Sequence, residues 1–318
     1  MATETKASKP PVPAAPDAWL DEYFNHLATF LSQPSLQSYS RALLGFWHWY
    51  EKERKEAPDW RNLQRHDFRA YLHSPDLRKK SHATIRLQFA ALRSFYRFLV
   101  DRGRLESSPV KGVKIPQLPK RLVKYFSTPE IETLMAAPSK PLPKNARAFE
   151  TLFCSRDIAM FETMYSCGLR ISELCGLRAK DVGVERRLVF VRGKGKRQRE
   201  IPIGEPALDA ILHYWRLLPR RPAGDTPVFL ARRKRDVSVS PRVFQQRLQK
   251  WIKKAGMEEG LTPHKLRHSY ATHLVDCDAD LRSVQELLGH AHLATTEIYT
   301  HVATGRLMQV YKRAHPRA

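Results

Sequence analysis

The sequence predicts a mainly α-helical protein with two domains. Apolar residues recur at steps of three and four along most of the chain, as they do on one face of a helix. Strands are expected only at 188–192 and 200–203, on either side of the glycine-containing turn GKGKRQR, and at one further short place beyond them. A chain of 318 residues is long enough for two domains that each bury a core.

The first domain is expected over residues 17–107, after a lead-in at 1–16 that is rich in Pro and Ala and is expected to be disordered. Helices are predicted over 17–31, from 34 onward through SLQSYSRALLGFWHWYEKE, over 67–72 and over 81–100. The last is the best defined, because its apolar residues recur at steps of four and three and form one core-facing side: Ile85, Phe89, Leu92, Tyr96 and Leu99.

A basic surface is expected beside that apolar side. Residues 79–97 contain no acid, and the segment 107–124, SSPVKGVKIPQLPKRLVK, contains three prolines, five basic residues and no acid. Runs of charge are most often solvated surface, but here we expect a surface that meets DNA phosphates, with residues 108–126 as an extended basic linker. The expected DNA-contacting residues are Lys79, Lys80, Arg86, Arg93, Arg97, Lys111, Lys114, Lys120 and Arg121.

The charge of the whole chain indicates a polyanionic partner. Lys and Arg number 55 against 32 Asp and Glu, a net charge of +23. A membrane surface is the weaker alternative, because no apolar run approaches the roughly 20 residues of a spanning helix. Ribosomal and chromatin proteins share the charge but not usually the six tryptophans. Four cysteines without a CxxC pair indicate reduced thiols and a cytoplasmic protein.

The second domain is expected over residues 127–318. Ser127, Thr128 and Pro129 are typical of a helix start. A Pro- and Lys-rich loop at 138–148, to which no role is assigned, precedes a helix over 149–166. Gly168 then turns the chain, so that Arg170 begins the next short helix.

The stretch 261–301 carries the chemistry of this domain. The spacing of Leu266, Tyr270 and Leu274 predicts a helix, on which His264 and Arg267 lie three residues apart on one face. A second helix is expected from Asp280, as N-cap, to Gly289, as C-terminal glycine. His290 would then lie at a helix end, with a tyrosine close behind it as a candidate nucleophile.

Four short motifs and one following tyrosine carry these residues in a fixed order: YSCGLRISEL, VRGKGK, HKLRH, LLGH and Tyr299. The ordered set resembles that of the tyrosine recombinases of the phage integrase family, Xer type. The resemblance implies a SAM-like core-binding domain and a catalytic domain that form a C-shaped clamp on duplex DNA. It also implies site-specific recombination through a 3′-phosphotyrosyl intermediate and a Holliday junction. The site residues implied are Arg170, Glu173, Lys194, His264, Arg267, His290 and Tyr299.

These residue types suit phosphodiester cleavage. The guanidiniums of Arg170 and Arg267 can fork onto the non-bridging oxygens, and Lys194 can protonate the leaving 5′ oxygen. Tyrosine has an ordinary pKa near 10, so Tyr299 needs His290 and the two arginines to favour its phenolate, or a base to take its proton during attack. His264 is expected to hydrogen-bond a phosphate oxygen or to shuttle a proton. Glu173 is expected to orient Arg170 or a histidine. Each residue alone would more often be an ordinary surface or salt-bridge residue.

No metal or nucleotide cofactor is expected. HKLRH lacks the glutamate of HExxH, and nearby arginines would repel a dication at His264 and His268. The turn GKG is not a phosphate-binding P-loop, because GxxxxGK[ST] is absent. The energy of the cut phosphodiester bond would be kept in the protein–DNA ester, so that rejoining needs no ATP.

Within the family, the linker and the closing residues HPRA resemble the XerC branch most. That resemblance implies a XerD-like recombinase in a heterotetramer on DNA, a dif-like site for resolving chromosome dimers, and a septal DNA translocase as a further candidate partner. The alternatives are a mobile-element integrase and a DNA-binding architectural protein without catalysis. The tail after 301 is expected to form a short helix capped by Thr304 and to dock on a neighbouring protomer.

Overall fold

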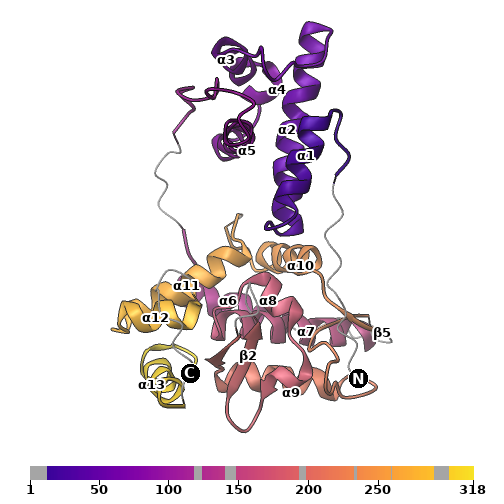
Figure 1. The fold of residues 1–318 in the computed structure, drawn as a ribbon. Coiled ribbons are helices and arrows are strands. Elements are labelled where there is room, and N and C mark those ends of the chain that lie inside the picture. Colours follow the sequence, from indigo (N-terminus) through magenta and orange to yellow (C-terminus); the bar gives the residue numbers. More distant parts are fainter. Residues whose placement is uncertain are drawn as a thin grey trace, which may run out of the picture. The chain divides into compact units, whose positions relative to one another are not determined.

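The computed structural model of the chain describes residues 13–117, 124–139, 148–192, 198–232, 235–258, 260–289 and 301–318. The chain divides into two compact units, Met1–Arg121 and Leu122–Ala318 (Figure 1). Each unit has its own buried core. The described elements are mainly helical with small antiparallel sheets, which confirms the predicted fold class. Among the helices described, none is long and apolar enough to cross a membrane.

The N-terminal unit contains the four predicted helices and one additional turn of helix. The elements are α1 (Ala18–Leu27), α2 (Gln33–Arg54), α3 (Arg65–His73), α4 (Pro75–Arg78) and α5 (His82–Asp101). Asp17 and Ser81 cap α1 and α5 with their side chains, because each accepts a bond from an otherwise unpaired backbone N–H. The five apolar residues predicted to form one side of α5 are all buried, and α5 packs against α2.

The segment that follows α5 also packs on this unit. Val110 and Val113 are buried in its core. Arg93 Nη2 donates to the Val113 carbonyl at 2.9 Å, and His82 Nδ1 lies 3.2 Å from the Gln117 carbonyl. The first part of the predicted linker therefore lies against the N-terminal unit. Lys120 and Arg121 are outside the described residues.

The C-terminal unit surrounds a small sheet with helices. Its helices are α6 (Thr128–Ala136), α7 (Ala148–Ser166), α8 (Ile171–Gly176), α9 (Glu205–Arg216), α10 (Pro241–Lys254), α11 (Pro263–Asp276), α12 (Leu281–Leu288) and α13 (His301–Ala314), with short 3₁₀ turns at Ala137–Ser139 and Ala179–Asp181. The sheet has the antiparallel order β1 (Val182–Gly183), β2 (Leu188–Arg192) and β3 (Gln198–Pro202). Within it, Val191 of β2 is paired with Arg199 of β3.

The expectation of one further strand is wrong. Two strands, β4 (Leu230–Arg232) and β5 (Arg235–Ser238), pair antiparallel in a second sheet. A lone strand would leave its backbone hydrogen-bonding groups unpaired, and pairing within a hairpin satisfies them.

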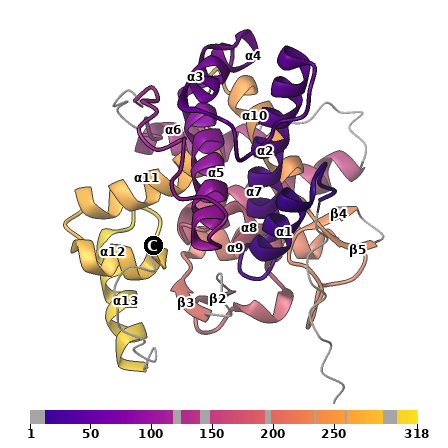
Figure 2. The same cartoon turned by 45° about the horizontal axis from the view of Figure 1, so that its top comes forward.

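The tail packs on its own unit, contrary to the expected docking on a neighbouring protomer. Helix α13 begins at His301, three residues before the expected cap at Thr304, and lies next to α12 in both views (Figures 1 and 2). Leu307 and Tyr311 are buried in the core, and the Tyr311 hydroxyl lies 2.8 Å from Ser166 Oγ. Two bonds from the Arg317 guanidinium to the Glu162 carboxylate fix the end of the tail.

Candidate active site

The site begins at the turn between α7 and α8. Gly168 has φ +55°, and a Cβ there would lie 2.4 Å from the Tyr270 ring, so only glycine fits. The turn places Arg170 at the N-cap of α8 and Glu173 on its first turn. The Glu173 carboxylate accepts bonds of 2.8 Å from the Arg170 backbone N–H and from Arg170 Nη1. The contact between these two predicted residues is thus present.

A second arginine, Arg199 on β3, forks onto the same carboxylate. Its Nη1 and Nη2 each lie 3.0 Å from one oxygen of Glu173. Arg199 was not among the predicted site residues, because it lies in a basic segment that also contains Lys194. Strand alternation was the available indication: Arg199 is two residues from Ile201, so it points to the core side of β3.

Arg267, on α11, is the third arginine of the group. It is buried, and it donates to the carbonyls of Gly168 and Leu288 at 2.6 Å each. Its Nη1 lies 3.7 Å from the nearer Glu173 oxygen. The three arginines and Glu173 are hereafter the arginine cluster.

The carboxyl end of α12 contacts the arginine cluster. Asp280 caps the start of this helix, and Gly289 ends it with φ +66°, both as predicted. The Gly289 carbonyl accepts a bond from Arg170 Nη2 at 3.4 Å. Gly289 also packs against Arg199, since a Cβ at this position would lie 3.0 Å from the Arg199 side chain. The arginine cluster therefore lies next to the residue that precedes His290.

The charges in the arginine cluster are strongly coupled. Burial acts to raise the pKa of Glu173, but the hydrogen bonds and charge of Arg199, followed by the bonds of Arg170, outweigh it and hold the pKa below 4.5. Burial, and next the charge of Arg170, lower the pKa of Arg267 to about 10, so this guanidinium remains protonated at neutral pH. Three positive groups against one carboxylate leave a net charge of +2. Such a site favours an anion.

The structure brings together only part of the predicted site. Arg170, Glu173 and Arg267 meet as described, and the side chain of Arg170 is 43% exposed and accessible to a ligand. His264 is exposed on the first turn of α11. Lys194, His290 and Tyr299 lie outside the described residues, as does most of the 138–148 loop.

His264 and His268, which were weighed as zinc ligands, lie four residues apart on α11. Both side chains are exposed on α11. Among the described residues, no group of three His, Cys, Asp or Glu side chains is placed to hold a metal ion.

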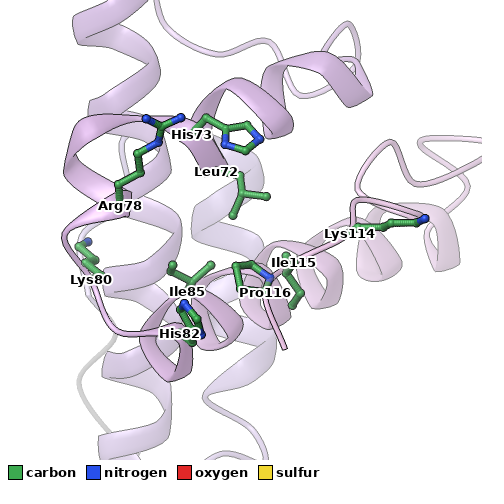
Figure 3. Close-up of a pocket in the computed structure, with 9 residues that line it drawn as sticks. All are labelled: Leu72, His73, Arg78, Lys80, His82, Ile85, Lys114, Ile115 and Pro116. Carbon is green, nitrogen blue, oxygen red and sulfur yellow. The ribbon is translucent and has the colours of Figure 1, made fainter. Parts of the chain in front are cut away.

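A basic pocket of about 450 Å³ lies on the N-terminal unit (Figure 3). Its apolar residues include Leu72 and Ile85, and its cationic or imidazole residues are His73, Arg78, Lys80, His82 and Lys114. Lys80 and Lys114 were predicted to contact DNA, and the other three were not. The remaining predicted contacts that the structure describes are all exposed, and one of them, Arg93, also donates to the Val113 carbonyl: Lys79, Arg86, Arg93, Arg97 and Lys111.

Comparison with known proteins supports the same chemistry. The phage integrase family matches residues 124–306, and the phage integrase N-terminal SAM-like domain matches residues 20–103. The tyrosine recombinase XerC of Syntrophus aciditrophicus (strain SB) is 38% identical over 81% of this chain and 82% of its own. That of Escherichia coli O157:H7 (strain EC4115 / EHEC) is 42% identical over 74% of this chain and 75% of its own.

A solved structure resembles the fold. The XerH site-specific recombinase bound to a palindromic difH substrate, in a post-cleavage complex, matches with a TM-score of 0.66 and 22% identity. The match covers 92% of this chain and 83% of XerH.

The family matches and the similar XerC recombinases show a protein that binds DNA and cleaves and rejoins its strands. The chain belongs to the phage integrase family of tyrosine recombinases. The curated relatives to which it is similar are XerC recombinases.

Proposed function

We propose that this chain cuts duplex DNA at a specific site with Tyr299 as nucleophile and rejoins the strands through a 3′-phosphotyrosyl intermediate. The observation that carries the proposal is the arginine cluster, which concentrates positive charge beside the end of α12. The residues that follow this helix end include His290 and Tyr299. A scissile phosphate bound to Arg170 would therefore lie close to Gly289, the residue directly before the segment that bears the proposed nucleophile.

Arg170 and Arg267 are the proposed ligands of the two non-bridging oxygens. A guanidinium has five N–H donors. Arg267 donates through one Nη1 and one Nη2 hydrogen to carbonyls, and its remaining N–H groups are the proposed donors to the phosphate. Because these groups are held in place before the substrate arrives, they stabilise the five-coordinate state without reorganising.

His264 and His290 are the proposed hydrogen-bonding and proton-transfer groups around the phosphate. His264 lies one turn before Arg267 on α11 and is exposed, so it is accessible to DNA. Either imidazole could accept the phenolic proton of Tyr299 during attack.

The variant Tyr299→Phe tests the nucleophile. It should bind site DNA as the wild type does, because phosphate contacts dominate affinity, but it should form no covalent adduct. A denaturing gel that still shows a protein–DNA adduct from this variant would contradict the assignment. A wild-type protein that binds DNA and forms no adduct would favour the non-catalytic architectural alternative.

Lys194 is the proposed general acid for the leaving 5′ oxygen. Lys194→Ala should slow cleavage, by about a hundredfold or more for a lost general acid. A 5′-bridging sulfur needs no proton to leave, so a substrate that contains it should restore most of the rate. Equally slow cleavage of both substrates would give Lys194 another role.

The finer assignment rests on the similarity to XerC recombinases. We propose that the target is a dif-like site, that the partner is a XerD-like recombinase in a heterotetramer, and that exchange passes through a Holliday junction. Chromosome-dimer resolution would then take place in the cytoplasm, with a septal DNA translocase as a candidate activator. Sequencing the DNA fragments trapped covalently in cells separates this proposal from a mobile-element integrase, which would recover the ends of an element instead.

The N-terminal unit is the proposed second half of a C-shaped clamp on DNA. The residues that line its pocket include Lys80, Lys114 and three further cationic or imidazole groups, and none of these lining residues is acidic. Phosphates of the DNA backbone are the expected ligands of this surface.

A further inference from the structure

We propose that Arg199 is a positioning residue for DNA cleavage. It locks the Glu173 carboxylate in one orientation, and Glu173 in turn sets the positions of the Arg170 and Arg267 guanidiniums. This inference rests on the proposed roles of those two arginines at the scissile phosphate. Arg199 itself does not touch the reacting atoms in this account.

The geometry of the fork carries the first step. Arg199 meets both oxygens of Glu173 at 3.0 Å, so the carboxylate cannot rotate without breaking a bond. Both side chains are shielded from water, at 7% and 5% exposure. A lysine would provide one point charge on a flexible stem and would leave the carboxylate free to turn.

Glu173 transmits this orientation to the other two arginines. One oxygen accepts from Arg170 Nη1 and the other from the Arg170 backbone N–H, which defines the N-cap of α8. The second oxygen also faces Arg267 Nη1 at 3.7 Å. A rotated carboxylate could not keep these contacts together.

Arg199 also supports the end of α12. Its side chain packs on Gly289 so closely that an added Cβ would lie 3.0 Å from Cδ, Nε and Cζ. The Gly289 carbonyl accepts a hydrogen bond from Arg170 Nη2. One buried side chain therefore contacts both the carboxylate that orients the arginines and the helix end that leads to His290 and Tyr299.

The test compares Arg199→Lys with Arg156→Lys on two substrates. Arg156 is a matched control, because it is a buried arginine of the same unit that pairs with Asp157 and donates to the Leu230 carbonyl. The substrates are a nicked site DNA with an ordinary scissile phosphate and the same DNA with a methylphosphonate there, which lacks one charged non-bridging oxygen. Single-site affinity, thermal stability and the rate of adduct formation are measured for each variant.

Arg199→Lys should cleave the ordinary phosphate at least about tenfold more slowly, since small misplacements of reacting groups can cost on the order of a hundredfold. Its affinity for a single site should stay within about twofold of wild type, because phosphate contacts elsewhere dominate binding. The rate loss of Arg199→Lys should be clearly smaller on the methylphosphonate, because its transition state carries less negative charge for the guanidiniums to stabilise. Arg156→Lys should lose thermal stability but keep the wild-type ratio of the two rates.

Two further variants test the positioning role of Arg199 independently. Arg199→Lys combined with Glu173→Gln should cleave no more than about twofold slower than Glu173→Gln alone, because both changes break one unit. Gly289→Ala adds a Cβ that presses on the Arg199 side chain. Like Arg199→Lys, it should slow cleavage of the ordinary phosphate more than cleavage of the methylphosphonate. Additive losses in the double variant, or a rate ratio like that of Arg156→Lys, would overturn the positioning role. A wild-type protein that forms no adduct would instead refute the proposed function.

Discussion

The two units of the molecule hold their positive charge in opposite ways. In the arginine cluster, Arg199 and Arg267 are buried and bonded to a carboxylate or to carbonyls, so each guanidinium has one position. In the N-terminal unit, Lys79, Lys80 and Arg86 are exposed to solvent. Both regions favour an anion, but only the first fixes where that anion must lie.

This difference separates reaction rate from affinity. A fixed guanidinium can stabilise charge that develops at one point in a transition state, which accelerates a reaction. Exposed lysines neutralise phosphates wherever the backbone passes, and they release counterions on binding. Changes in the arginine cluster should therefore alter cleavage, and changes in the N-terminal unit should alter the salt dependence of binding.

The largest expected effect comes from deleting the residues after Gly305, which uncovers the core beside the arginine cluster. Leu307, Tyr311 and His315 are buried, and losing even one large core side chain costs about 2–5 kcal/mol. We expect the C-terminal unit to unfold and binding to single and paired sites to fall together, as measured by thermal melting and gel shift. Lys312→Ala, on an exposed position of α13, should change little. Intact single-site binding with lost pairing would restore the idea of a tail that docks on a neighbour.

Glu173→Gln should have the next largest effect, because it leaves buried arginines without a counter-charge. Breaking a buried ion pair costs about 3–5 kcal/mol. The folded-state pKa of Glu173 lies below its usual 4.5, so its contribution is complete above that pH and is lost as the pH falls through the folded pKa. The stability gap between wild type and variant, from urea unfolding, should be widest at neutral pH and should narrow in acid. A stability gap that stays constant with pH would argue against an ionic role for Glu173. Glu132→Gln, at an exposed position, is the control.

Lys80→Ala should have the smallest effect. Removing one phosphate contact should reduce the slope of log affinity against log salt by about 0.9. The cleavage rate at saturating DNA should remain that of the wild type, because the pocket is on the other unit. Lys52→Ala, also exposed but outside the pocket, should leave the slope unchanged. If Lys80→Ala altered the cleavage rate but not the slope, the N-terminal unit would affect the reaction rate rather than the salt dependence of binding, which would contradict this division.

Local rules were sufficient for much of the fold. The periodicity of α5 and the caps of α12 could be read directly, because apolar spacing and the residues Asp280 and Gly289 act within a few positions. The Arg170–Glu173 contact was also predictable, since the two residues lie one helical turn apart.

Long-range packing decided what the sequence did not reveal. Arg199 lies in a run of basic residues, and only pairing with Val191 turns it toward Glu173. The tail contains too few apolar residues to indicate whether it covers its own domain or another, and its partner Ser166 is distant in sequence. The pairing of β4 with β5 likewise depends on a contact between strands rather than on either strand alone.

The most direct test of the account identifies the residue that becomes attached to DNA. Wild-type protein is trapped on a nicked site DNA, digested with trypsin and analysed by mass spectrometry. The peptide 283–306, SVQELLGHAHLATTEIYTHVATGR, contains Tyr299 as its single tyrosine. We expect this peptide to carry the DNA through a 3′ phosphate. An adduct on another peptide, or one linked through a 5′ phosphate, would contradict it.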